Sequence, residues 1–84
     1  MDTIEINEYD ILLDIFRFIR DYSTDTYTMT QVLNELVRHL ARSGYTVEKL
    51  PRTEKNSRII SVEGYKYKLI HWENWSKYDV VLTA

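Results

Sequence analysis

The chain has 84 residues and a net charge of −2, and 44% of its residues are hydrophobic. With only two glycines and one proline, this composition is typical of an ordered globular chain and not of a linker or a disordered tail. The absence of cysteine excludes disulfide frameworks, thiolate nucleophiles and the usual zinc-finger ligand sets. The length predicts one domain that covers residues 1–84.

The amino-terminal segment has the pattern of neither a secretion signal nor a membrane span. Several acidic residues precede Arg17, the first basic residue, whereas a signal peptide begins with basic ones. The longest apolar stretch is interrupted by Asp14 and Arg17 and is far shorter than the ~20 residues that cross a bilayer. We therefore expect a cytoplasmic protein.

A first helix is predicted over residues 8–22. Asn7 can act as its N-cap, and Asp10 lies near the positive end of the helix dipole. Ile6 and Ile11 have the spacing of a hydrophobic staple. Apolar side chains cover about half of the circumference of this helix, which is more than one packing surface requires.

A second helix is predicted over residues 29–42. Thr28 and Gln31 have the spacing of a capping box, and Gly44 supplies the left-handed residue that ends the helix in a Schellman motif. Its apolar residues occupy a narrow band, as expected for a helix that lies on a single core.

After the second helix the hydrophobic period changes from helical to extended. Residues 45–50 are a predicted strand, residues 51–57 a polar and basic connection, and residues 78–83 a last strand.

Residues 58–72, RIISVEGYKYKLIHW, are predicted to form a β-hairpin. Glu63 and Gly64 are a two-residue turn at its tip, whose second position favours a positive φ. A two-residue turn at this point fixes which residues of the two strands lie opposite each other. On one face it pairs Val62 with Tyr65, Ile60 with Tyr67 and Arg58 with Leu69; on the other it pairs Ser61 with Lys66 and Ile59 with Lys68.

The predicted order is therefore two helices followed by three or four antiparallel strands. The most economical packing is an α+β fold, in which both N-terminal helices lie on one face of a three- to four-stranded antiparallel meander. A winged-helix-like fold is the alternative because it also ends in a basic hairpin, although it needs a third helix for which the sequence has no start signal.

The first helix has more apolar surface than a small fold covers easily. Either it is wedged between the second helix and the sheet, or its surplus face is buried when a second copy or another protein docks. Burying each further large apolar side chain contributes roughly 1.5 to 3 kcal/mol, so a few exposed ones favour association. Leu13 and Phe18, at the edges of the apolar arc, and Ile11 are the candidate interface residues on this helix.

Two tryptophans, Trp72 and Trp75, form an aromatic group with Tyr78 near the carboxyl end. Such a group either closes the far edge of the sheet over the helices or anchors a protein partner, since aromatic side chains are enriched at interfaces. Both tryptophans are therefore candidate interface residues.

A group of basic residues surrounds the first two strand connections. Such side chains can neutralise the phosphates of a nucleic acid, although Glu48, Glu54 and Glu63 are interleaved among them. The candidate anion-binding residues are Lys49, Arg52, Lys55, Arg58, Lys66 and Lys68.

The sequence contains no motif for catalysis or cofactor binding. Gly44 and Gly64 are both assigned to turns, which leaves no glycine-rich phosphate loop. Glu35 and His39 are one helical turn apart, a weak metal-ligand pattern that an ordinary histidine at the edge of the core explains better. We expect no enzymatic activity, no cofactor and no metal.

These features favour a small non-enzymatic protein-binding module of the inhibitor or adaptor type. Its partner is another protein or a second copy of the chain, which docks on residues 8–22, and chain length alone also favours an origin in a phage or mobile element. The alternative is a nucleic-acid-binding regulator that uses residues 49–68. A pI of about 5.6 makes nucleic acid the second choice, and no membrane partner is expected.

Overall fold

The computed structural model describes residues 7–72 and 75–83, which form two helices and a four-stranded sheet. The helices are α1 (Glu8–Ile19) and α2 (Met29–Arg42), and the strands are β1 (Val47–Lys49), β2 (Ser57–Val62), β3 (Tyr65–His71) and β4 (Tyr78–Thr83).

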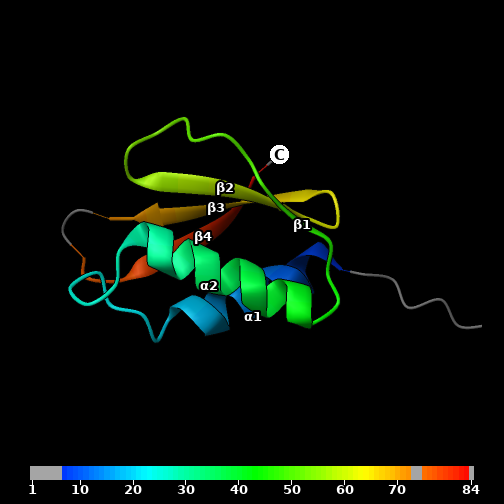
Figure 1. Cartoon of the computed structure of the whole chain (residues 1–84), viewed down its shortest axis with the longest axis horizontal. Helices are drawn as coiled ribbons and strands as arrows, with labels where there is room; N and C mark the ends of the chain where they lie inside the picture. Colours follow the sequence, from blue (N-terminus) through cyan, green and yellow to red (C-terminus); the bar gives the residue numbers. More distant parts are fainter. Residues whose placement is uncertain (1–6, 73–74, 84) are drawn as a thin grey trace, which may run out of the picture.

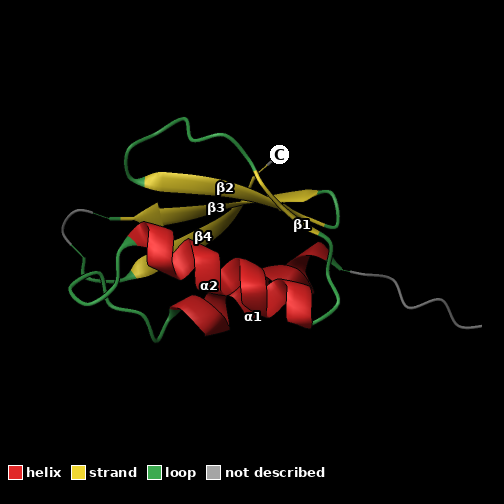
Figure 2. Cartoon of the chain, viewed as in Figure 1, coloured by secondary structure: helices red, strands yellow, loops and turns green. Residues whose placement is uncertain are grey.

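The sheet is an antiparallel meander with the strand order β1-β2-β3-β4. Both helices lie on one of its faces (Figure 1), and the opposite face has no helix over it (Figure 2). The predicted α+β arrangement is confirmed. The winged-helix-like alternative is wrong, because the described residues contain no third helix. None of the helices in this part of the chain has the length and apolarity that crossing a bilayer requires.

α2 begins and ends where local signals predicted. The Thr28 hydroxyl accepts a hydrogen bond from the Gln31 N–H at 3.2 Å, and the Gln31 side chain accepts one from the Thr28 N–H at 2.9 Å. At the other end Gly44 has a φ of +95°, and the Tyr45 N–H reaches the Leu40 carbonyl at 3.1 Å. These bonds complete the capping box and the Schellman motif.

α1 begins as predicted but ends at Ile19 instead of Tyr22. The Asn7 side chain accepts a hydrogen bond from the Tyr9 N–H at 2.8 Å, as expected of an N-cap. The helix ends early because the following backbone is used elsewhere: the Thr24 N–H donates to the Ser76 carbonyl at 3.0 Å, just before β4. Ile6, the other half of the predicted staple, lies outside the described residues.

β2 and β3 form the predicted hairpin in the predicted register, with Ile60 opposite Tyr67. Glu63 and Gly64 have φ values of +52° and +85°, so both turn residues are left-handed, as a type I′ turn requires. Glu63 is held in this conformation by Thr46. The Thr46 N–H donates to the Glu63 carboxylate and the Glu63 N–H donates to the Thr46 carbonyl, each at 3.0 Å.

β1 is shorter than the predicted strand 45–50, whereas β4 has the predicted bounds. Tyr45 completes the Schellman motif, and Thr46 is bonded to the hairpin tip, so neither extends β1.

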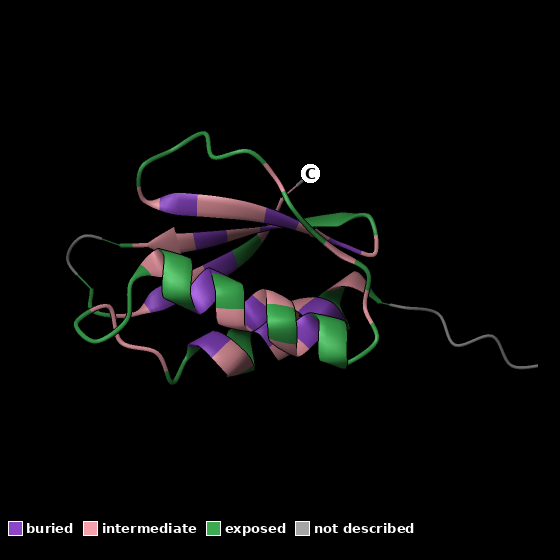
Figure 3. Ribbon diagram, in the orientation of Figure 1, coloured by how far each residue is buried: buried purple, intermediate pink, exposed green. Residues whose placement is uncertain are grey.

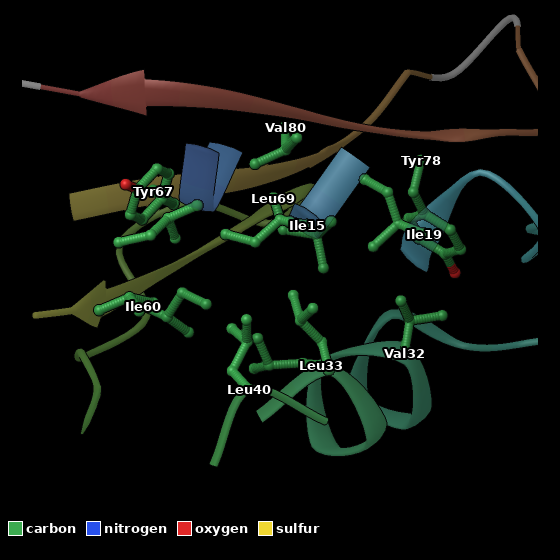
Figure 4. Close-up of a cluster of buried hydrophobic side chains, with 13 residues drawn as sticks. Ile15, Ile19, Val32, Leu33, Leu40, Ile60, Tyr67, Leu69, Tyr78 and Val80 are labelled. Atoms are coloured by element: carbon green, nitrogen blue, oxygen red, sulfur yellow. The ribbon is translucent and has the colours of Figure 1, made fainter. Parts of the chain in front are cut away.

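The core lies between the sheet and the two helices. In Figure 4, Ile15 of α1 lies between Leu69 of the sheet and Leu33 of α2, and Ile19 lies between Tyr78 of the sheet and Val32 of α2. The buried core residues are Ile11, Ile15, Ile19, Val32, Leu33, Leu36, Leu40, Ile60, Val62, Tyr67, Leu69, Tyr78 and Val80.

Two buried tyrosines of the sheet place their hydroxyl groups on the helical layer. Tyr67 donates to the Glu8 carbonyl at 2.7 Å, and Tyr78 donates to the Tyr27 carbonyl at 2.6 Å. Burial raises the pKa of Tyr67 to about 12 and raises the pKa of Tyr78 above its ordinary value. Both phenols therefore remain neutral donors at physiological pH, and each ties a strand to the segment beside a helix end.

The capping box of α2 provides a direct test of its boundary. We expect Thr28→Ala to lower the free energy of unfolding by about 1 kcal/mol, because the Gln31 N–H loses its acceptor. Thr30→Ala is the matched control, since Thr30 is exposed in the same helical turn and alanine favours the helix. Urea denaturation followed by circular dichroism measures both changes. Equal destabilisation by the two substitutions would contradict the role of the cap.

Candidate functional site

One side of α1 exposes three large side chains along its length. Tyr9, Leu13 and Phe16 are 63%, 46% and 43% exposed. Their spacings of four and three residues place them on one helical face. The opposite face carries Ile11 and Ile15 into the core. We call Tyr9, Leu13 and Phe16 the α1 stripe.

The interface residues predicted on this helix lie in three different environments. Leu13 is in the centre of the α1 stripe. Ile11 is completely buried in the core, so it is not available to a partner in the folded chain. Phe18 is half-buried, and its ring stacks on His39 of α2 with the ring centroids 4.6 Å apart. The edge of the apolar arc at Phe18 is therefore the contact between the two helices.

Tyr9 and Phe16 were not predicted as surface residues. On a helical wheel they continue the wide apolar arc, of which only the edges were predicted as interface positions. Their spacing from Leu13 was the available signal, because residues at positions i, i+4 and i+7 share a face.

The two predicted tryptophans lie on the uncovered face of the sheet. The Trp72 indole N–H donates to Asp79 at 3.3 Å, and Asp79 alternates with core residues along β4, so its side chain points away from the helices. Trp72 and Trp75 are 49% and 51% exposed. Together with Lys68 and Ile70 they line a hollow of about 540 Å³, which we call the tryptophan hollow. It does not continue the α1 stripe, because the helices cover the other face.

The predicted anion-binding residues do not form one surface. Lys49 contacts the Asn34 side chain of α2 on the helical side. Lys66 and Lys68 project from the uncovered face, where Lys68 forms an ion pair with Glu54 at 2.9 Å. The Lys68 ammonium also holds the pKa of Glu54 below its ordinary value. Much of the positive charge at Lys68 is therefore balanced within the chain.

Arg52 and Lys55 belong to the connection between β1 and β2, which is exposed over most of its length (Figure 3), and Arg58 lies at the start of β2. Arg52 donates to the carbonyls of Glu54 and Lys55, both at 3.4 Å. Arg58 donates to the same two carbonyls, at 3.4 and 3.3 Å. Both guanidinium groups thus shape this connection.

Titratable side chains between the helices bond to one another. The Tyr22 hydroxyl donates to Glu35 at 2.6 Å, and His39 lies 3.3 Å from the Asp14 carboxylate. The hydrogen bond to Glu35, followed by burial, raises the pKa of Tyr22 to about 12. Glu35 and His39 therefore have separate partners. Within the described residues, no group of three or more acidic, histidine or cysteine side chains is placed to hold a metal ion.

Comparisons with protein-family models, with curated proteins and with solved structures find no match to this chain. Candidate binding surfaces are therefore identified from the structure alone, and there are two of them in the described part of the chain. The α1 stripe lies on the helical layer, and the tryptophan hollow lies on the uncovered face of the sheet.

The bond between Tyr22 and Glu35 predicts an alkaline limit to stability. Because the pKa of Tyr22 in the fold lies above its ordinary value of 10, its contribution is complete below pH 10 and is lost as the pH rises toward 12. We expect Glu35→Gln to move the Tyr22 ionisation to lower pH, because the carboxylate charge that opposes the phenolate is removed. Tyrosinate absorbance measures the titration, and the double variant with Tyr22→Phe isolates the Tyr22 signal. An unchanged midpoint would contradict the assignment.

Proposed function

We propose that this chain is a small protein-binding module of the inhibitor or adaptor type, and that the α1 stripe is its binding surface. The main observation in support is that Tyr9, Leu13 and Phe16 remain exposed on a helix whose other face is completely buried. The buried core cluster is formed by other side chains. Exposed aromatic residues such as Tyr9 and Phe16 are typical anchors of protein interfaces.

The surroundings of the stripe also have the character of an interface. Asp10, Arg17 and Arg20 are exposed beside it and provide a charged rim. Interfaces commonly combine an apolar centre with a polar rim, in which the centre supplies most of the affinity. The stripe fits the central part of such an interface.

Other functions have weaker support. Nucleic-acid binding needs a continuous basic surface, but Lys49 lies on the helical side of the fold, and Lys68 on the uncovered face is paired with Glu54. We favour binding over enzymatic activity because the polar side chains between the helices connect α1 to α2, as Tyr22 bonds to Glu35 and His39 lies against Asp14.

A charge placed in the stripe tests the proposal. We expect Leu13→Glu to weaken capture of the binding partner at least about tenfold, because a carboxylate would enter the apolar centre of the interface. Ala41→Glu is the matched control, since Ala41 is exposed on α2 away from the stripe. Capture from the native host followed by titration of the purified partner measures the loss, and circular dichroism checks the fold. Phe18→Glu is unsuitable, because it would break the ring contact with His39.

The same capture is repeated after nuclease treatment and with Lys66→Glu. Equal binding by wild type, Leu13→Glu and Ala41→Glu would contradict the proposal. Binding that is lost only after nuclease treatment or in Lys66→Glu would identify nucleic acid as the partner instead.

A further inference from the structure

The charges beside the α1 stripe have opposite signs at the two ends of the helix. Glu8 and Asp10 lie in the first turn, whereas Arg17 lies in the last turn and Arg20 is the C-cap residue. Among the described residues, no ion pair joins Asp10, Arg17 or Arg20 to another side chain. Asp21 follows Arg20 and is also exposed, so the two arginines outnumber the acid at this end. The stripe thus has an apolar centre, an acidic end and an end with net positive charge.

We propose that the partner of the α1 stripe is the α1 stripe of a second copy, in antiparallel orientation about a two-fold axis near Leu13. This inference rests on the proposed binding role of the stripe and names its partner. In such a pair Leu13 meets its own equivalent, Tyr9 meets Phe16 of the second copy, and Asp10 meets Arg17 of the second copy. Every contact occurs twice, as two-fold symmetry requires.

The spacing of the residues suits this orientation. Each residue advances a helix by about 1.5 Å, so Tyr9 lies about 6 Å before Leu13, and Phe16 lies about 4.5 Å after it. In an antiparallel pair centred on Leu13, Tyr9 and Phe16 of the two copies therefore lie at nearly the same height. Asp10 and Arg17 have the mirrored spacings of about 4.5 and 6 Å and match equally well. A parallel pair would place acid against acid and base against base.

Within residues 7–72 and 75–83, the fold leaves this face of α1 accessible. α2 contacts α1 at Phe18 and Asp14, both of which meet His39, and the isoleucine face is buried between α2 and the sheet. A buried aromatic side chain covers roughly 150 to 250 Å², so three half-exposed residues from each copy would bury about 600 Å² in total. Specific interfaces bury at least about 1,200 Å². Charged residues must therefore contribute the rest, and we expect a dimer that dissociates on dilution.

Exchange of charges between two variants tests the pairing. We expect Asp10→Arg and Arg17→Asp each to raise the dimer dissociation constant about three- to tenfold, because each places like charges together twice. An equimolar mixture should dimerise about as well as wild type, because the arginine introduced in one variant then faces the aspartate introduced in the other. Sedimentation velocity at several concentrations measures all three samples, and circular dichroism confirms that the single variants are folded.

A single cysteine near the two-fold axis provides an independent test. The chain has no cysteine, so Leu13→Cys introduces one thiol per copy. A disulfide needs Cα atoms about 4.4 to 6.8 Å apart, a separation that helices packed at roughly 8 to 10 Å between axes provide at the contact. Oxidised glutathione would accept the two electrons and two protons that the thiols lose. We expect Leu13→Cys to form a covalent dimer at least about tenfold faster than Ala41→Cys, whose thiol lies away from the stripe.

The outcomes separate this inference from the proposed function. Rescue in the mixture together with fast cross-linking of Leu13→Cys supports the antiparallel pair. A wild type that stays monomeric at high concentration, or a dimer without rescue in the mixture, overturns it. If that monomer still captures another protein and Leu13→Glu abolishes the capture, the stripe is a binding surface for a different partner, and only the self-pairing fails.

Discussion

Burial of Ile11, Ile15 and Ile19 between the sheet and α2 fixes the position of α1, and the accessible surface of the chain follows from it. These residues recur every four positions, so they use one side of the helix and direct the opposite side to solvent. The helices form one layer on one face of the sheet, so in the described part of the chain no second layer covers the outer side of α1. The exposure of Leu13 and its neighbours on the stripe is therefore a geometric result of how the core is filled.

Polar side chains in this fold mainly connect elements. Tyr67 and Tyr78 join the sheet to backbone carbonyls of the helical layer, and Tyr22 joins the two helices through Glu35. Each phenol acts as a neutral donor, and a raised pKa extends that state to alkaline pH. Three of the seven tyrosines thus connect elements of the fold through their hydroxyl groups. In the proposed interface, the partner would therefore meet the large exposed residues and not these titratable groups.

Local signals determined which parts of the fold were predictable. α2 has a capping residue, a capping partner and a terminal glycine, and its bounds were predicted correctly. The hairpin register follows from strict alternation around Glu63 and Gly64. The end of α1 was wrong because it depends on pairing with the residues before β4, far along the chain. For the same reason the helical wheel pointed to Leu13 as a surface residue but not to Phe16. Tertiary packing decides which flank of a wide apolar arc meets α2.

The separation of the two exposed surfaces bears on how the chain would work. The tryptophan hollow lies on the uncovered face of the sheet, whereas the α1 stripe belongs to the layer on the other face. Pairing through α1 therefore leaves Trp72 and Trp75 accessible in both copies. A two-fold dimer would present the hollow twice, and two linked sites bind a partner with repeated features more tightly than one site does. If the chain pairs as proposed, this arrangement would favour an adaptor, which holds two partners or two copies of one partner, over an inhibitor that uses a single face.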